Sequence, residues 1–262
     1  MGRKFVSRIR QPRIVAAMLV SIMAVAVAGE ASAQAAGNFT CRASALRAEL
    51  PTGTTLLEPV ASNRPNDPCV SDSDGLLSLN ANVLGIGIRT AALQSSTSAT
   101  PTGATSKASV LDARISQLLG TSVRITVARS EASVSCVNGS PAFSSSSEVV
   151  GLTVNGAPVV VTGAPNQSVL GGLLILNQRI VTADRITRRA AVVTLGGLLR
   201  VVVAESIADV SGNPCAPPPP QCSDGIDNDG DGQTDYDPRN DPPLHPFGDQ
   251  QCISPEDNDE SA

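Results

Sequence analysis

The chain has 262 residues, a formal net charge of −5 at pH 7 and only 2% aromatic residues. So few rings, together with arginines that form no basic stripe, argue against nucleic-acid binding, which needs stacking platforms and a continuous cationic surface. The length leaves room for one good-sized domain and a small module after a leader segment.

The first segment has the order of a secretory signal peptide: basic, then apolar, then small residues. Five basic residues precede an apolar run from Ile14 to Gly29, and Ala31-Ser32-Ala33 forms a small-x-small cleavage pattern. A membrane anchor is the alternative, but the run is shorter than the roughly 20 residues that span a bilayer. We expect residues 1–33 to be removed after Ala33, which places the mature chain outside the cell or in the cell envelope, with no membrane span.

The mature part contains an even number of cysteines, which predicts disulfides in an oxidising compartment. Zinc is the alternative, but the sequence has no C-x-x-C and His245 is its only histidine. The last two cysteines bracket the acidic end of the chain, and the first four pair most simply in order. Among the many possible pairings, the expected bridges are therefore Cys222–Cys252, Cys41–Cys69 and Cys136–Cys215.

Residues 34–213 are expected to form a β-rich domain, because apolar and polar residues alternate in much of this segment. A strand is predicted over Leu76–Leu93, and a long flexible loop over the Ser-, Thr- and Ala-rich segment Ser95–Ser109. Strands are predicted again from Leu111 to Ser116 and from Val123 toward Cys136, although the first of these also fits a short helix.

The strongest hairpin signal is Asn155-Gly156 between two runs of β-branched residues, since a type I′ turn needs positive φ at both positions. A Ser-rich loop, Ser144–Ser147, precedes it, and short apolar runs follow at Val169–Leu176, Ala190–Leu195 and Leu198–Ala204. About eight to ten short strands predict an all-β antiparallel sandwich or barrel-like fold, with a β-solenoid as the alternative. With so few aromatic residues, Val, Leu, Ile and Ala must fill the core.

Two polar clusters in this domain are interpreted as surface features. Arg185, Arg188 and Arg189 are expected on a solvated turn or sheet face rather than in a phosphate site. Asp72-Ser73-Asp74-Gly75 looks like half of a calcium loop, but we expect a turn.

The composition changes at residues 214–220, where Pro217–Pro220 predicts a stiff polyproline spacer between two units. From Gln34 to Pro220 there are 13 basic and 11 acidic residues, whereas residues 221–262 contain 12 acidic residues and one basic residue, Arg239. Such an acidic segment has too few apolar residues to fold by burial alone. It needs a disulfide, a cation or both.

Three stretches of the chain resemble the choice-of-anchor P family of bacterial exported proteins. They are Glu148–Gly156, Leu174–Gln178 and Val201–Val210, with the sequences EVVGLTVNG, LILNQ and VVVAESIADV. The resemblance covers the chain from Cys41 to Cys215. It implies one β-rich domain joined to a variable C-terminal end and a secreted or surface location, and it implies no activity.

The segment Asp227–Asp235 predicts a calcium site, because its D-x-D-x-D-G-x-x-D pattern is similar to thrombospondin type 3 repeats and dockerin loops. Carboxylates two residues apart line one side of a loop, and Ca²⁺ takes roughly six to eight such oxygens. Pro238 stands where an EF-hand has a bidentate glutamate, so the last ligand must come from farther along the chain. A Cys222–Cys252 bridge is expected to bring that part of the chain back to the loop. The predicted ligands are Asp227, Asp229, Asp231, the carbonyl of Gln233, Asp235, Asp257 and Glu260, with Asp241 in reserve.

The alternatives to calcium are a disordered acidic tail and a magnesium site. The register of acids with Gly232 and the flanking cysteines favours calcium over the tail, and many carboxylates in a flexible loop suit calcium better than magnesium. The sequence has no G-x-S-x-G elbow and no phosphate loop. We therefore predict a non-enzymatic, secreted or cell-surface structural or adhesive protein. An extracellular binding module for a glycan or a surface protein is the alternative, and a hydrolase is third.

Overall fold

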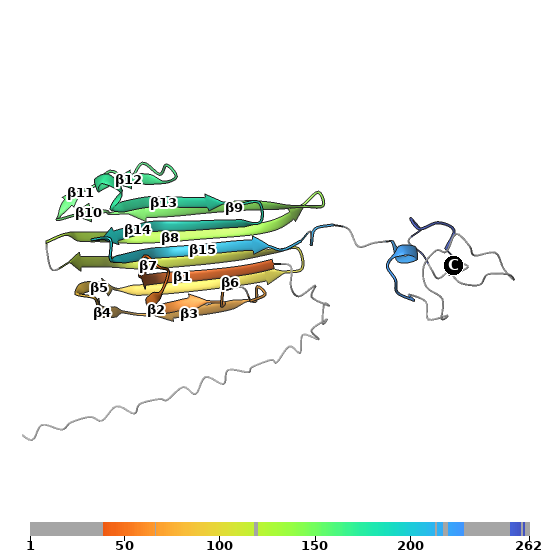
Figure 1. Ribbon diagram of the computed structural model, residues 1–262, viewed down its shortest axis with the longest axis horizontal. Helices are drawn as coiled ribbons and strands as arrows, with labels where there is room; N and C mark the ends of the chain where they lie inside the picture. The colour runs from red at the N-terminus through yellow and green to blue at the C-terminus, as the bar shows by residue number, and fades with distance from the viewer. Residues whose placement is uncertain are drawn as a thin grey trace, which may run out of the picture. The chain divides into compact units, whose positions relative to one another are not determined.

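The computed structural model describes residues 39–65, 67–117, 120–212, 214–216, 220–227, 252–257 and 259. Within these residues the chain is almost entirely β, and two antiparallel sheets, A and B, lie face to face (Figure 1). Neither sheet closes on itself, so the predicted β-sandwich is confirmed and the solenoid alternative does not apply. No helix within the described residues is long and apolar enough to cross a membrane.

Sheet A joins the beginning of the described chain to the end of the sandwich. Strands β1 and β15 pair along nearly their whole length, from Phe39 opposite Val210 to Glu49 opposite Arg200. This long-range pairing joins the first and last strands of the sandwich. The order of the sheet is β12 (Gln167–Val169), β13 (Leu174–Val181), β14 (Arg185–Leu195), β15 (Leu199–Val210), β1 (Phe39–Glu49) and β2 (Thr55–Ser62).

Sheet B is organised around two long strands, β7 (Gly103–Gln117) and β8 (Ser122–Val137), which pair with each other. The outer edge of each is shared by two shorter strands, because neither neighbour is long enough to cover it. The strands that complete the sheet are β3 (Asp72–Leu76), β4 (Leu79–Val83), β5 (Ile86–Thr90), β6 (Ala92–Thr100), β9 (Ser140–Val150), β10 (Thr153–Val154) and β11 (Ala157–Pro158).

The core between the sheets is aliphatic, as the composition predicts. Its main cluster consists of alanine, valine, leucine and isoleucine side chains from both sheets, such as Leu46, Ile88 and Leu176. A smaller cluster contains Phe39 and three of the cysteines. Between the sheets, small hydroxyl groups also meet: Ser130 Oγ and Ser206 Oγ are 2.8 Å apart. Small side chains let the two sheets approach closely without aromatic rings.

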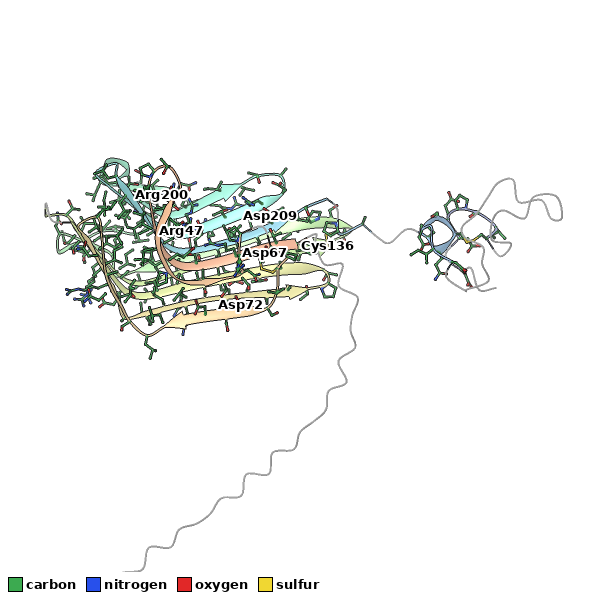
Figure 2. All side chains as sticks on the ribbon, turned by 60° about the horizontal axis from the view of Figure 1, so that its bottom comes forward. Arg47, Asp67, Asp72, Cys136, Arg200 and Asp209 are labelled. Carbon is green, nitrogen blue, oxygen red and sulfur yellow. A yellow bond between two sulfur atoms is a disulfide. The ribbon has the colours of Figure 1, made fainter. Side chains whose placement is uncertain are left out.

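All three expected disulfides are present. Cys41–Cys69 ties β1 to the segment before β3, and Cys136–Cys215 ties the end of β8 to the segment after β15 (Figure 2 labels Cys136). The third, Cys222–Cys252, closes the C-terminal segment on itself. The simplest pairing in chain order is therefore the one present, and three disulfides are compatible with an extracellular protein.

Two segments predicted as loops are strands. Ser95–Ser109 contains most of the β6–β7 hairpin, and Ser144–Ser147 lies inside β9. Every second residue of the hairpin faces the core, including Ser95, Thr97 and Ser106, each at most 5% exposed. These side chains are polar but small enough for the tightly packed interior. The residues that face the core therefore differ little in hydrophobicity from those that face solvent, and the sequence shows little of the alternation typical of a strand.

Two turns also differ in detail from the prediction. The single strand expected over Leu76–Leu93 is divided, because a turn with positive φ at Leu84 and Gly85 separates β4 from β5. The hairpin turn at Asn155-Gly156 is confirmed, with φ of 51° and 80°. Its second strand, however, is the short β11 rather than the valine run that follows.

Candidate functional site

The predicted calcium loop lies largely outside the described residues. Asp229, Asp231, Gln233, Asp235 and Glu260 belong to that part of the chain, as does the reserve ligand Asp241. Two predicted ligands, Asp227 and Asp257, are described. Among the residues described, no three acidic, histidine or cysteine side chains are close enough to hold a metal ion, so the calcium site stays a prediction.

The described ends of this segment form a disulfide-closed base. The short 3₁₀ turn η2 (Gln221–Ser223) carries Cys222, whose sulfur is bonded to Cys252. The backbone N–H of Cys222 donates to the carbonyl of Asp257 at 3.1 Å. The bridge thus brings residues on both sides of the acidic loop together at its base.

Asp72 and Asp74 have a structural role that differs from the turn predicted for them. Both lie on strand β3 (Figure 2 labels Asp72). Their carboxylates accept hydrogen bonds from backbone N–H groups at the end of β2. The N–H of Asn63 donates to Asp72 at 3.1 Å, and the N–H of Ala61 donates to Asp74 at 3.3 Å. These acids therefore cap the free edge of sheet A, where unpaired N–H groups would otherwise be exposed.

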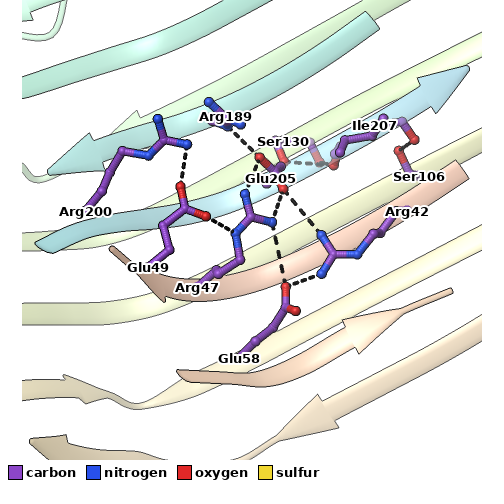
Figure 3. A network of polar contacts seen from close by, with 11 residues as sticks. Arg42, Arg47, Glu49, Glu58, Ser106, Ser130, Arg189, Arg200, Glu205 and Ile207 are labelled. Carbon is purple, nitrogen blue, oxygen red and sulfur yellow. Dashed lines mark hydrogen bonds and ion pairs between the residues drawn. The ribbon is translucent and has the colours of Figure 1, made fainter. Parts of the chain in front are cut away.

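A charged cluster covers the face of sheet A that points away from sheet B (Figure 3). Ser206 contacts sheet B, so its neighbour Glu205 on β15 points the opposite way, yet Glu205 is 0% exposed. Arg47 donates to both oxygens of this carboxylate, with 3.0 Å between Nη2 and Oε2. Arg189 donates to Oε2 and Arg42 to Oε1. Three guanidinium groups thus surround one carboxylate.

A second ring of acids balances these arginines. Glu58 on β2 pairs with Arg42, and Glu49 on β1 pairs with both Arg47 and Arg200. Because its members come from β1, β2, β14 and β15, the cluster joins four adjacent strands of sheet A. The side chains of Arg42, Arg47 and Arg189 have only about a tenth of their surface exposed.

The electrostatics of the cluster favour the ionised carboxylate. Burial alone would raise the pKa of Glu205, but the attraction of Arg47 and Arg189 and their hydrogen bonds outweigh it, so the pKa of Glu205 lies below its ordinary value. The same pairing raises the pKa of Arg47 despite its burial. The Glu205 carboxylate therefore stays ionised, and the Arg47 guanidinium protonated, in the folded protein near neutral pH.

The predicted solvated arginine cluster is wrong for two of its three members. Arg189 belongs to the buried cluster around Glu205. Arg188 points the opposite way, toward β9, where its Nε donates to Ser147 Oγ at 2.8 Å, and it is only 6% exposed. Arg185 alone is well exposed, and it pairs with Asp209. Adjacent residues of a strand point to opposite faces, but the sequence could not show that both Arg188 and Arg189 would have buried or part-buried partners.

A shallow trough of about 810 Å³ crosses the outer face of sheet B, over β3, β6, β7, β8 and β9. Its floor includes two ion pairs between neighbouring strands, Lys107–Glu131 at 3.2 Å and Arg129–Glu148 at 3.3 Å. Polar side chains surround them: Ser73, Gln94, Ser96, Ser109 and Ser146. The lining offers hydrogen-bond donors and acceptors in regular rows. Its charged groups are held in these two ion pairs, apart from Asp74, whose carboxylate accepts from the Ala61 N–H.

Sequence reasoning missed this trough because parts of three of its strands, β6, β7 and β9, were assigned to serine-rich loops. In Ser95–Ser109 mostly small side chains occupy both faces of the strands, so the sequence contains little signal of alternation.

No protein-family model, no curated protein and no solved structure matches this chain. The resemblance to the choice-of-anchor P family therefore stays a prediction based on the three stretches that carry it.

Proposed function

We propose that this chain is an exported structural or adhesive protein without enzymatic activity, whose C-terminal segment folds around calcium. The observation that carries the proposal is the disulfide-closed base of that segment. The Cys222–Cys252 bridge and the bond from the Cys222 N–H to the Asp257 carbonyl hold a predicted last ligand beside the start of the acidic loop. A ligand from beyond Cys252 is what the loop requires, because Pro238 fills the usual glutamate position.

The physical case rests on charge. Residues 221–262 contain 12 acids and one basic residue, so repulsion opposes a compact unliganded state. The bridge lowers the conformational entropy of the unliganded loop, which reduces the free-energy cost of folding it by roughly 3–4 kcal/mol. A divalent cation removes the repulsion, and its binding energy becomes folding energy.

Calorimetric titration of the mature chain, Gln34–Ala262, with calcium tests the proposal. We expect heat of binding that is lost when Asp229 and Asp231 are both replaced by Asn, and little heat with magnesium. Glu256→Gln is the matched control, because Glu256 is an exposed acid of the same segment outside the predicted ligand set. No heat at millimolar calcium, or equal loss in the control, would contradict the calcium site.

Removal of calcium by a chelator should unfold the C-terminal segment but not the sandwich. Without calcium, proteases should cleave the chain after Pro220, while the far-ultraviolet circular dichroism of the sandwich persists, because that domain has an aliphatic core and two disulfides of its own. Loss of the sandwich signal together with the tail would refute independent folding.

A second candidate function is glycan binding by the sandwich, which the trough over β3 and β6–β9 favours. Its hydroxyl and amide groups suit a polyhydroxylated ligand, although it has no ring for sugar stacking among the residues that line it. A glycan array probed with the purified mature chain checks this. If no glycan on the array binds the chain, glycan binding is refuted and the structural or adhesive role is the one that stays proposed.

A further inference from the structure

A second trough on the outer face of sheet B contains an unusual row of arginines. It has a volume of about 740 Å³ and extends over β4, β5, β7, β8 and β10. Directly paired positions on these strands form one row: Asn80, Arg89, Arg114, Arg124 and Thr153. Their neighbours along the strands, such as Ile88 and Ile115, are buried in the core. The row therefore points outward into the trough.

Three like charges side by side on adjacent strands destabilise a sheet unless something compensates them. The compensation within the described residues is partial. Asp112 accepts from Arg124 Nε at 2.8 Å and from Arg114 Nη2 at 2.7 Å. Arg89 bonds to the Asn80 amide oxygen at 3.2 Å, and within the described residues it forms no ion pair. The row thus carries three positive charges against one negative charge.

The position of Asp112 depends on an irregularity in β7. Leu111 pairs with Val127 and Ala113 with Ile125, so Asp112 is skipped in the ladder, and its φ is 49°. This conformation is uncommon for a residue other than glycine, although aspartate tolerates it better than most. The irregularity places the carboxylate between Arg114 and Arg124, where it holds both guanidinium groups in place.

We propose that this trough binds a linear anionic polysaccharide through its carboxylate or sulfate groups. Guanidinium groups bind such planar or tetrahedral anions with paired hydrogen bonds. Neighbouring strands are about 4.8 Å apart, so the row presents cations over roughly 10 Å, which fits repeated charges on a chain better than one small ion. Asn82, Ser116 and Ser122 line the trough and can bond to sugar hydroxyls.

The lining also argues against single-stranded nucleic acid. Binding of single strands relies on aromatic rings on which bases stack, and no aromatic residue is among the residues that line the trough. The inference extends the proposed extracellular role, but it involves only sandwich residues. A failed calcium titration would therefore not contradict polysaccharide binding by the trough, and a failed polysaccharide test would not contradict the calcium site.

The test measures binding of the mature chain to polygalacturonate, dextran sulfate, unmodified dextran and single-stranded oligothymidylate. We expect binding to one or both charged polysaccharides that weakens as salt rises. Arg89→Gln should lower the affinity about fivefold, as for an exposed ion pair, whereas Arg64→Gln, an exposed arginine outside the trough, should not. Asp112→Asn should strengthen binding, because the internal carboxylate no longer competes with the polymer.

Four outcomes would overturn the proposal: no binding to either charged polysaccharide, equal retention of unmodified dextran, equal or tighter binding of oligothymidylate, or equal effects of Arg89→Gln and Arg64→Gln. Melting temperatures of all variants show whether a loss of binding reflects loss of the fold.

Discussion

Replacing Glu205 by Gln should destabilise the sandwich more than any comparable change at its surface. The substitution preserves the shape of the side chain but removes the one carboxylate that Arg42, Arg47 and Arg189 share. Removing one partner of a buried ion pair costs about 3–5 kcal/mol, because the opposite charges stay buried without compensation. The arginines are about a tenth exposed and can turn partly toward water, so we expect about 3 kcal/mol.

Denaturant unfolding with the disulfides intact measures this cost as a change in the free energy of unfolding. Glu148→Gln is the matched control, because Glu148 pairs with Arg129 at the surface, where both side chains are about half exposed. Such pairs contribute less than about 1 kcal/mol. If both variants lost the same amount, the cluster around Glu205 would contribute no more than a surface ion pair.

The same cluster predicts a dependence on acid. The pKa of Glu205 is lowered on folding below its ordinary value, so its contribution to stability is complete above about pH 5 and is lost as pH falls through the folded-state pKa. Unfolding curves from pH 6 down to pH 3 should show a decline that is smaller in the Glu205→Gln variant. Parallel declines in the two proteins would show that other groups cause the acid sensitivity.

Three further predictions test the fold and the leader. Gly103→Ala should destabilise the protein by roughly 1–3 kcal/mol, because a Cβ there would be 2.5 Å from the carbonyl oxygen of Val134, whereas Gly75→Ala meets only ordinary contacts and should be tolerated; equal melting temperatures would refute the clash. Loss of the Cys136–Cys215 bridge, which closes a separation of 79 residues, should cost about 2–5 kcal/mol in denaturant unfolding, and an unchanged midpoint would count against its role. N-terminal sequencing of the exported protein should begin at residue 34, and a start at Met1 would disprove cleavage after Ala33.

The sequence by itself determined the architecture and its covalent links. Alternating β-branched residues predicted an all-β antiparallel fold, Asn155-Gly156 predicted a type I′ turn, and cysteine order predicted the three bridges. These features depend on local periodicity, on backbone conformation at single residues and on chain order, all of which are visible in one dimension. The calcium loop at Asp227–Asp235 also follows from local spacing, but it lies largely outside the described residues and stays a prediction.

Only the tertiary structure decided which polar residues are buried and which positions share a surface. Ser95 and Thr97 line the interior although their segment resembles a loop, and Arg188 and Arg189 face opposite sides of β14. Arg89, Arg114 and Arg124 become one row because residues far apart in sequence are paired in register across three strands. Register is set by the packing of whole sheets, so the charges that meet across strands cannot be inferred from the order of residues along any one of them.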